Sequence, residues 1–208
     1  MDLWSRLDEV HTRFDVLEHP FYQRWSRGEL SREDLAVYAG EYRHAVVALA
    51  EASAGAARTA DAADRAALAA HAGEEAAHIG LWDDFAQAAG TVAAEPAPET
   101  RACARSWAGE HRELLGHLAA LYAIESAQPA ISRVKAAGLR DHYGFEAGPA
   151  TAYFDLHAER DVEHAAEGRA LLAGRVEEAD EDALVSEAEQ VLRANWRLLD
   201  GVERLCGR

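Results

Sequence analysis

The sequence predicts an all-helical fold, a single-domain bundle of seven to eight helices. Ala-rich stretches such as residues 62–70 favour helix, because alanine loses no side-chain entropy there. Apolar residues recur at helical spacing, and no segment reads convincingly as a strand. The chain's 15 glycines and 5 prolines are few and gather where turns are expected. With 208 residues, residues 1–208 fit one domain with one core.

The expected helices of the first half are predicted by apolar stripes and end signals. A helix over residues 3–17 presents Leu3, Leu7 and Val10 on one face. A short helix over residues 21–27 ends at Gly28. Ser31 and Asp34 resemble a capping box, which opens a helix to about residue 58, and another helix covers residues 61–89.

The second half begins with a connector at residues 91–99, followed by helix over residues 100–127. Pro129 is expected to kink or restart that helix, while Gly138 and Gly144 punctuate the segment after it. Pro149 fits the first position of a helix that runs to about residue 173. Acidic residues 180–182 are expected to cap a last helix that ends near residue 206.

Composition excludes several classes of protein. The formal net charge of −16 argues against nucleic acid and anionic membrane partners, both of which require a basic surface. No apolar run reaches the length of a membrane span, and the first residues lack the apolar segment of a signal peptide. Two cysteines are too few for a disulfide framework. We therefore expect a soluble cytoplasmic protein.

The strongest chemical signal is the segment FDLHAERDVEHAAEG. His157, Asp161 and His164 are spaced i, i+4 and i+7, so a helix places them on one stripe. Such a stripe can converge on a metal ion without distortion of the backbone. A charged solvent face is the alternative interpretation, because acidic and basic residues lie close by.

A second signal is HAGEEAAHIGLW. Glu75 and His78 form the E-x-x-H pair by which helical bundles present a carboxylate and an imidazole to a dinuclear metal site. Glu74 lies i−4 from His78 and could take the same role, so the sequence leaves the choice between the two acids open. Asp161 and His164 repeat the spacing with a shorter acid.

Two further acids lie in apolar helical segments. Glu125 follows Leu121, Tyr122 and Ile124, where an unpaired carboxylate would be costly, and Glu41 lies in a strongly apolar helix. Four buried carboxylates require counter-ions, and two divalent cations balance their formal charge. Three imidazoles complete a mixed nitrogen and oxygen ligand set that suits iron or manganese. The hypothetical ligands are Glu41, Glu75, His78, Glu125, His157, Asp161 and His164.

Lys135 is the chain's single lysine among 21 basic residues. Drift of composition towards arginine explains the imbalance equally well. Lysine differs from arginine, however, because a buried lysine can lose its proton and act as an amine nucleophile or proton donor.

Four segments in order resemble the heme-oxygenase-like dimetal oxidases, and most closely their p-aminobenzoate-forming branch. These segments are HPFYQRWSRGELSREDLAVYAGEYRHAV, EEAAHIGLWDDFA, LYAIESAQPAISRVKAAGLRDHYGF and YFDLHAERDVEHA. The resemblance covers about residues 15 to 170, and its superfamily also includes metal-independent TenA-like (thiaminase II) and PqqC-like enzymes.

This resemblance implies two iron ions (or iron with manganese), dioxygen as co-substrate, an external reductant and a homodimer. It implies a lysine at the position of Lys135, and a Glu at the position of Glu41 as an additional ligand in some members. The ligands that it implies are Glu75 (or Glu74), His78, Glu125, His157, Asp161 and His164. Tyr22 matches a sacrificial precursor tyrosine, and Tyr38 matches a second pocket tyrosine. The substrate is then an internal tyrosine, with an external small amine, amino acid or fatty acid as the alternative. A metal-independent enzyme is the rival class.

Overall fold

The computed structural model describes residues 2–175 and 180–207, and within them the chain forms eight α-helices, one short 3₁₀ helix and no strand. The all-helical prediction is confirmed. The elements are α1 (Leu3–Arg13), η1 (Val16–Glu18), α2 (Pro20–Ser26), α3 (Arg32–Thr59), α4 (Arg65–Ala89), α5 (Pro98–Ala108), α6 (Leu114–Asp141), α7 (Pro149–Ala173) and α8 (Glu181–Leu205).

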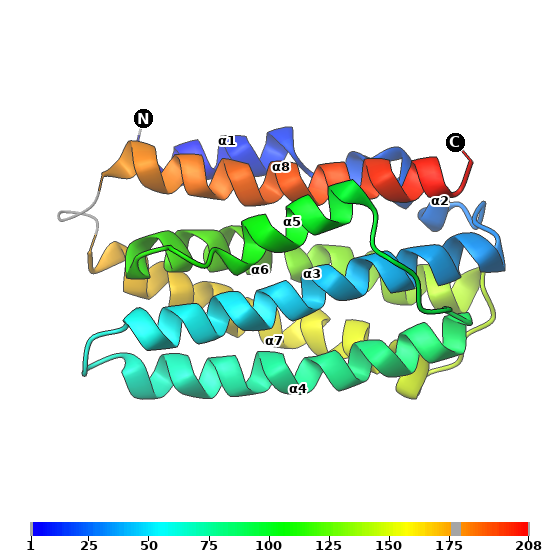
Figure 1. The fold of residues 1–208 in the computed structure, drawn as a ribbon, viewed down its shortest axis with the longest axis horizontal. Coiled ribbons are helices and arrows are strands. Elements are labelled where there is room, and N and C mark those ends of the chain that lie inside the picture. Colours follow the sequence, from blue (N-terminus) through cyan, green and yellow to red (C-terminus); the bar gives the residue numbers. More distant parts are fainter. Residues whose placement is uncertain (1, 176–179, 208) are drawn as a thin grey trace.

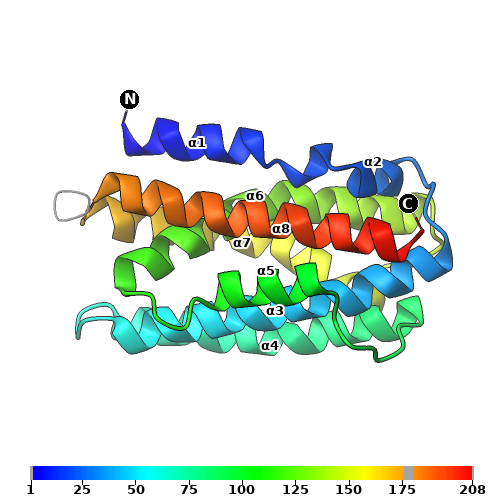
Figure 2. The ribbon, with the colours of Figure 1, turned by 45° about the horizontal axis from the view of Figure 1, so that its top comes forward.

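The helices form an elongated bundle (Figure 1). α1 and α8 lie side by side along one side, α3 and α4 run along the opposite side, and α6 and α7 lie between these pairs (Figures 1 and 2). α7 packs against α6 on one side and against α4 on the other. Among the residues that the structure describes, no helix is long and apolar enough to cross a membrane.

Three predicted helix starts are confirmed by local end signals, whereas the helix predicted from residue 61 starts at Arg65. The Ser31 hydroxyl accepts the Asp34 N–H at 3.0 Å, and the Asp34 carboxylate accepts the Ser31 N–H at 3.0 Å. Pro149 opens α7, and the Asp180 carboxylate accepts the N–H groups of Asp182 and Ala183 before α8. These are local signals, so the sequence alone could specify them.

Two other predicted helix boundaries were wrong. α1 ends at Arg13 rather than at residue 17, because the Asp15 carboxylate accepts the Leu17 N–H and begins η1. The predicted helix over residues 100–127 is two helices, α5 and α6, joined by residues 109–113. The Arg112 guanidinium donates to the carbonyls of Ser106 and Trp107 at the end of α5, and it pairs with Glu187 of α8.

α6 runs through Pro129, so the expected restart of the helix at this proline is wrong. A proline inside a helix has no N–H to donate to the carbonyl four residues earlier. That carbonyl belongs to Glu125, a predicted ligand one turn before Pro129, and it receives no N–H from residue 129.

Candidate metal centre

α4 carries three side chains on one face towards the interior of the bundle. His71, Glu75 and His78 have the spacing i, i+4 and i+7, so they share a stripe of the helix. Glu75 and His78 are buried, and His71 is half-buried. His71 was not among the predicted ligands.

α7 presents the matching stripe from across the bundle. His157, Asp161 and His164 have the same i, i+4 and i+7 spacing, and each is no more than 2 % exposed. The alternative of a charged solvent face is excluded for these three residues. The polar neighbours Glu159 and Glu163 lie on the exposed side of the helix, as the periodicity requires.

α6 supplies one carboxylate between these two helices. Glu125 is 2 % exposed, in a run of buried residues that includes Leu121, Ala123 and Ile124. Burial raises the pKa of Glu125, and the adjacent His71 imidazole opposes that rise. A carboxylate in such surroundings needs a positive partner.

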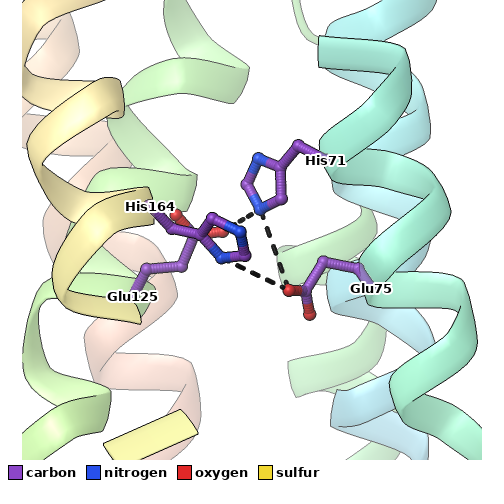
Figure 3. A group of neighbouring side chains, drawn as sticks. All are labelled: His71, Glu75, Glu125 and His164. Carbon is purple, nitrogen blue, oxygen red and sulfur yellow. Dashed lines mark ion pairs between the residues drawn. The ribbon is translucent and has the colours of Figure 1, made fainter. Parts of the chain in front are cut away.

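The first group of converging atoms joins α4, α6 and α7 (Figure 3). His71 Nε2 lies 3.0 Å from Glu125 Oε1 and 3.8 Å from Glu75 Oε1. His164 Nδ1 lies 3.6 Å from Glu75 Oε1. The four ligand-type atoms of His71, Glu75, Glu125 and His164 all lie within 4.8 Å of one another.

A second group shares Glu75 with the first. His78 Nδ1 lies 3.2 Å from Glu75 Oε1, and His157 Nε2 lies 4.0 Å from Glu75 Oε2. Asp161 lies against the first group, with Oδ1 3.4 Å from His164 Nδ1. Glu75 therefore belongs to both groups of ligand-type atoms.

The hydrogen bonding of these atoms tests whether the cluster fits a metal. All seven residues have at least one buried nitrogen or oxygen without a hydrogen-bond partner among the described residues: His71 Nε2, Glu75 Oε1, His78 Nδ1, Glu125 Oε1, His157 Nε2, both Asp161 carboxylate oxygens and His164 Nδ1. Each such atom costs about 1–3 kcal/mol if nothing satisfies it. Imidazole nitrogens and carboxylate oxygens that converge without completed hydrogen bonds are what a cation requires, and this mixture of ligands suits iron or manganese.

Outer contacts orient two of the imidazoles. His157 Nδ1 lies 2.7 Å from the Tyr153 carbonyl, so this nitrogen carries the proton and Nε2 faces the cluster. His164 Nε2 lies 3.2 Å from Glu74 Oε2, which leaves Nδ1 towards the cluster. Partners of this kind fix the tautomer of a metal-binding histidine.

The same contacts separate the roles of Glu74 and Glu75. Glu74 is partly exposed and pairs with Arg160 at 2.8 and 2.9 Å, and this ion pair lowers the pKa of Glu74 to about 2. Burial would raise the pKa of Glu75, but the adjacent His157 and His78 imidazoles hold it below its ordinary range. Glu75 is therefore the acid inside the cluster, and Glu74 supports His164 from outside.

The structure does not bring Glu41 to the cluster. Its carboxylate oxygen Oε2 accepts the Ala97 N–H at 3.0 Å and the Thr100 hydroxyl, both at the start of α5. Glu41 thus satisfies donors at a helix N-terminus instead of joining the metal-type atoms. The described cluster contains three carboxylates, from Glu75, Glu125 and Asp161, where the sequence predicted four.

A second buried region, which we call the lysine chamber, surrounds Lys135 with Tyr22, Tyr38, Tyr42 and Phe154. Lys135 Nζ lies 4.5 to 5.7 Å from the centres of these four rings. The Tyr22 and Tyr38 hydroxyls are 2.8 Å apart, and burial raises the pKa of both well above its ordinary value. Burial also lowers the pKa of Lys135 well below its ordinary value.

The lysine chamber and the cluster lie along the same helices. Glu125, Gln128, Ser132 and Lys135 form one buried stripe of α6. Ten residues separate Glu125 from Lys135, or about 15 Å of helix rise. On α7, the Tyr153 ring stacks on His157 at 4.0 Å between centroids, so aromatic side chains fill the space beside the cluster.

The fold and this site define a helical-bundle protein with a buried carboxylate and imidazole centre of the type that holds metal. A family model described as "Iron-containing redox enzyme" matches residues 37–196. The chain belongs to this family of iron-containing redox enzymes.

Curated relatives agree with the family. The chain is 32% identical over 214 residues to a 4-aminobenzoate synthase from Chlamydia muridarum, covering 96% of this chain and 89% of the relative. It is 33% identical to a 4-aminobenzoate synthase from Chlamydia trachomatis, covering 96% and 91%. The predicted family resemblance is confirmed.

Solved structures share the fold. A protein with a heme oxygenase-like fold from Shewanella denitrificans aligns with a TM-score of 0.81, at 20% identity, over 100% of this chain and 94% of that one. A TenA homologue from Pseudomonas syringae pv. tomato aligns with a TM-score of 0.83, at 20% identity, over 97% and 91%. At this identity the likeness establishes the architecture alone.

Proposed function

We propose that this chain is a non-heme dinuclear iron (or iron–manganese) oxidase that forms p-aminobenzoate from its own Tyr22, with dioxygen as co-substrate. The observation that carries this proposal is the pair of ligand groups that share Glu75, together with seven residues whose buried nitrogen or oxygen atoms make no hydrogen bond among the described residues. The relatives named 4-aminobenzoate synthase support the product.

The ligands divide between the two groups. His71, Glu125 and His164 would hold one cation, His78 and His157 the other, and Glu75 would bridge them, with Asp161 beside His164. Two divalent cations carry four positive charges, and the three carboxylates carry three negative charges. The centre would therefore keep one net positive charge, which favours the binding of an anion or a reducible molecule. When bound, the metal pair supplies Lewis acidity and redox capacity for dioxygen activation.

The chain's own residues would position the proposed substrate, the Tyr22 side chain, and a nearby amine. The Tyr22 hydroxyl is hydrogen-bonded to Tyr38 in a region closed to water, which holds its ring in place. Lys135 stands over that ring, and burial lowers its pKa, which favours the neutral amine with its lone pair. A neutral amine at this place can serve as the amino donor or as a base for the phenol proton.

Substitution of Tyr22 tests the proposal. Tyr22→Phe removes only the hydroxyl, so we expect p-aminobenzoate formation to be lost while two equivalents of ferrous ion still bind. Tyr143→Phe is the matched control, because Tyr143 contacts backbone carbonyls outside the lysine chamber. Product formation by Tyr22→Phe would reject the internal substrate and favour an external one.

Metal analysis separates this proposal from the metal-independent class. We expect anaerobic titration to bind two ferrous ions per chain and oxygen to produce a transient visible absorption. A protein that is active after complete removal of iron and manganese would place this chain with the metal-independent enzymes of the same fold.

A further inference from the structure

An apolar pocket of about 290 Å³ opens beside the first ligand group. Its rim includes the exposed residues Ala67 and Ala170, and its floor is formed by His71, Glu125 and His164. The pocket therefore connects the surface between α4 and α7 with the atoms that are placed to bind a cation.

The walls of this pocket are aliphatic. Leu68, Leu118, Leu121 and Leu171 line it, and neither lysine nor arginine is among its lining residues. Away from the floor, the lining therefore offers no cationic side chain to the carboxylate of a fatty acid or an amino acid. The one acid outside the floor, Glu167, is exposed. The walls thus suit small neutral apolar molecules on their way to the floor.

The pocket lies on the opposite side of the cluster from the lysine chamber. On α6, Leu118 and Leu121 precede Glu125, whereas Lys135 comes after it. On α7, Leu171 comes after His164, whereas Phe154 of the lysine chamber precedes His157. The two spaces therefore approach the cluster from different ends of the same helices.

We propose that this pocket is the entry and binding site for dioxygen, a small neutral apolar molecule. The inference rests on the proposed function, in which Tyr22 and Lys135 are internal and dioxygen must come from solvent. Apolar cavities of about 150 Å³ stay dry and take up xenon or benzene, so this larger pocket has room for a gas. His71, the ligand that lines this pocket from α4, would then face arriving dioxygen.

Xenon uptake by the metal-free protein tests the site without any activity. We expect a xenon atom in this pocket in crystals under xenon pressure. The double variant Ala67→Phe/Gly168→Leu should exclude it, because both positions line the pocket and a Cβ on Gly168 meets only Tyr122 Cβ at 3.9 Å. Ala66→Phe/Gly80→Leu is the matched control, with an exposed alanine and an exposed glycine of α4 away from the pocket.

The iron-loaded protein gives the second measurement. The pocket-filling variant should raise the KM for dioxygen several-fold with unchanged binding of ferrous ion, whereas the control variant should leave both unchanged. Absence of xenon from the pocket, or an unchanged KM for dioxygen in the filled variant, would overturn the inference. Xenon in the pocket of a protein that neither binds iron nor consumes oxygen would instead overturn the proposed function and leave an apolar gas site.

Discussion

The cluster and the lysine chamber are both buried, but the cluster gathers charged groups whereas the lysine chamber favours a neutral one. In the cluster, three carboxylates face four imidazoles, and atoms of all seven side chains converge without completed hydrogen bonds. In the lysine chamber, one amine lies among aromatic rings, and no ion pair among the described residues includes Lys135. The cluster can be stabilised by cations, whereas the lysine chamber stabilises the neutral form of its amine.

The difference arises from a few positions on shared helices. Glu125 and Lys135 lie on the same stripe of α6, and both are at most 2 % exposed. Their neighbours on other helices decide their states, because α4 and α7 bring imidazoles to Glu125 while α2 and α3 bring phenol rings to Lys135. Four substitutions, from the largest expected effect to the smallest, test this contrast.

Glu75→Gln should abolish the binding of both cations, because Glu75 belongs to both ligand groups. Even outer-shell partners change metal affinity by about 10–100-fold, so the loss of a shared ligand should exceed that range. Ferrous ion titration measures the change. Glu51→Gln, an exposed acid of α3, controls for the loss of one charge. Retention of two tightly bound cations would contradict a shared role for Glu75.

Lys135→Met should stabilise the metal-free protein near pH 7 by about 1–3 kcal/mol, because a buried amine without a charged partner is costly. Burial depresses the pKa of Lys135, so the unfolded chain binds a proton that the folded chain excludes. Stability of the parent therefore rises with pH up to the pKa of the unfolded lysine, about 10.4.

The gain from Lys135→Met should accordingly shrink between about pH 7 and about pH 10 in urea unfolding experiments. Lys135→Arg is the opposing variant, because arginine keeps its charge and should destabilise the fold. A gain that is independent of pH would show that packing, rather than the excluded proton, causes the effect.

Glu74→Gln should weaken the binding of ferrous ion by about tenfold without changing the stoichiometry. Its carboxylate orients His164 from outside the cluster and pairs with Arg160. Titration beside Glu75→Gln provides the comparison, because the two acids are adjacent in sequence and only one lies within the cluster. Equal losses in both variants would remove the distinction between these roles.

Glu41→Gln should leave ferrous ion binding unchanged and lower stability by about 1 kcal/mol, since Glu41 accepts donors at the start of α5. Thermal unfolding and iron titration of the same preparation measure both effects. A large loss of bound iron in this variant would show that Glu41 is a metal ligand after all.

The sequence alone predicted what local periodicity and end signals control. The stripe of His157, Asp161 and His164 results from helical spacing, and the caps at Ser31, Pro149 and Asp180 need only neighbouring residues. The pattern H-x-x-x-acid-x-x-H also occurs at His71, Glu75 and His78, so comparison of the two segments could have found His71.

Tertiary structure decided which of these groups meet. Helical spacing shows which residues share a face but not which face turns inward or what lies opposite. Only the packing of α4 against α7 separates Glu75 from Glu74, and only the position of α5 takes Glu41 away from the cluster. The break between α5 and α6 likewise depends on Arg112 reaching Glu187 of α8, a contact between residues distant in sequence.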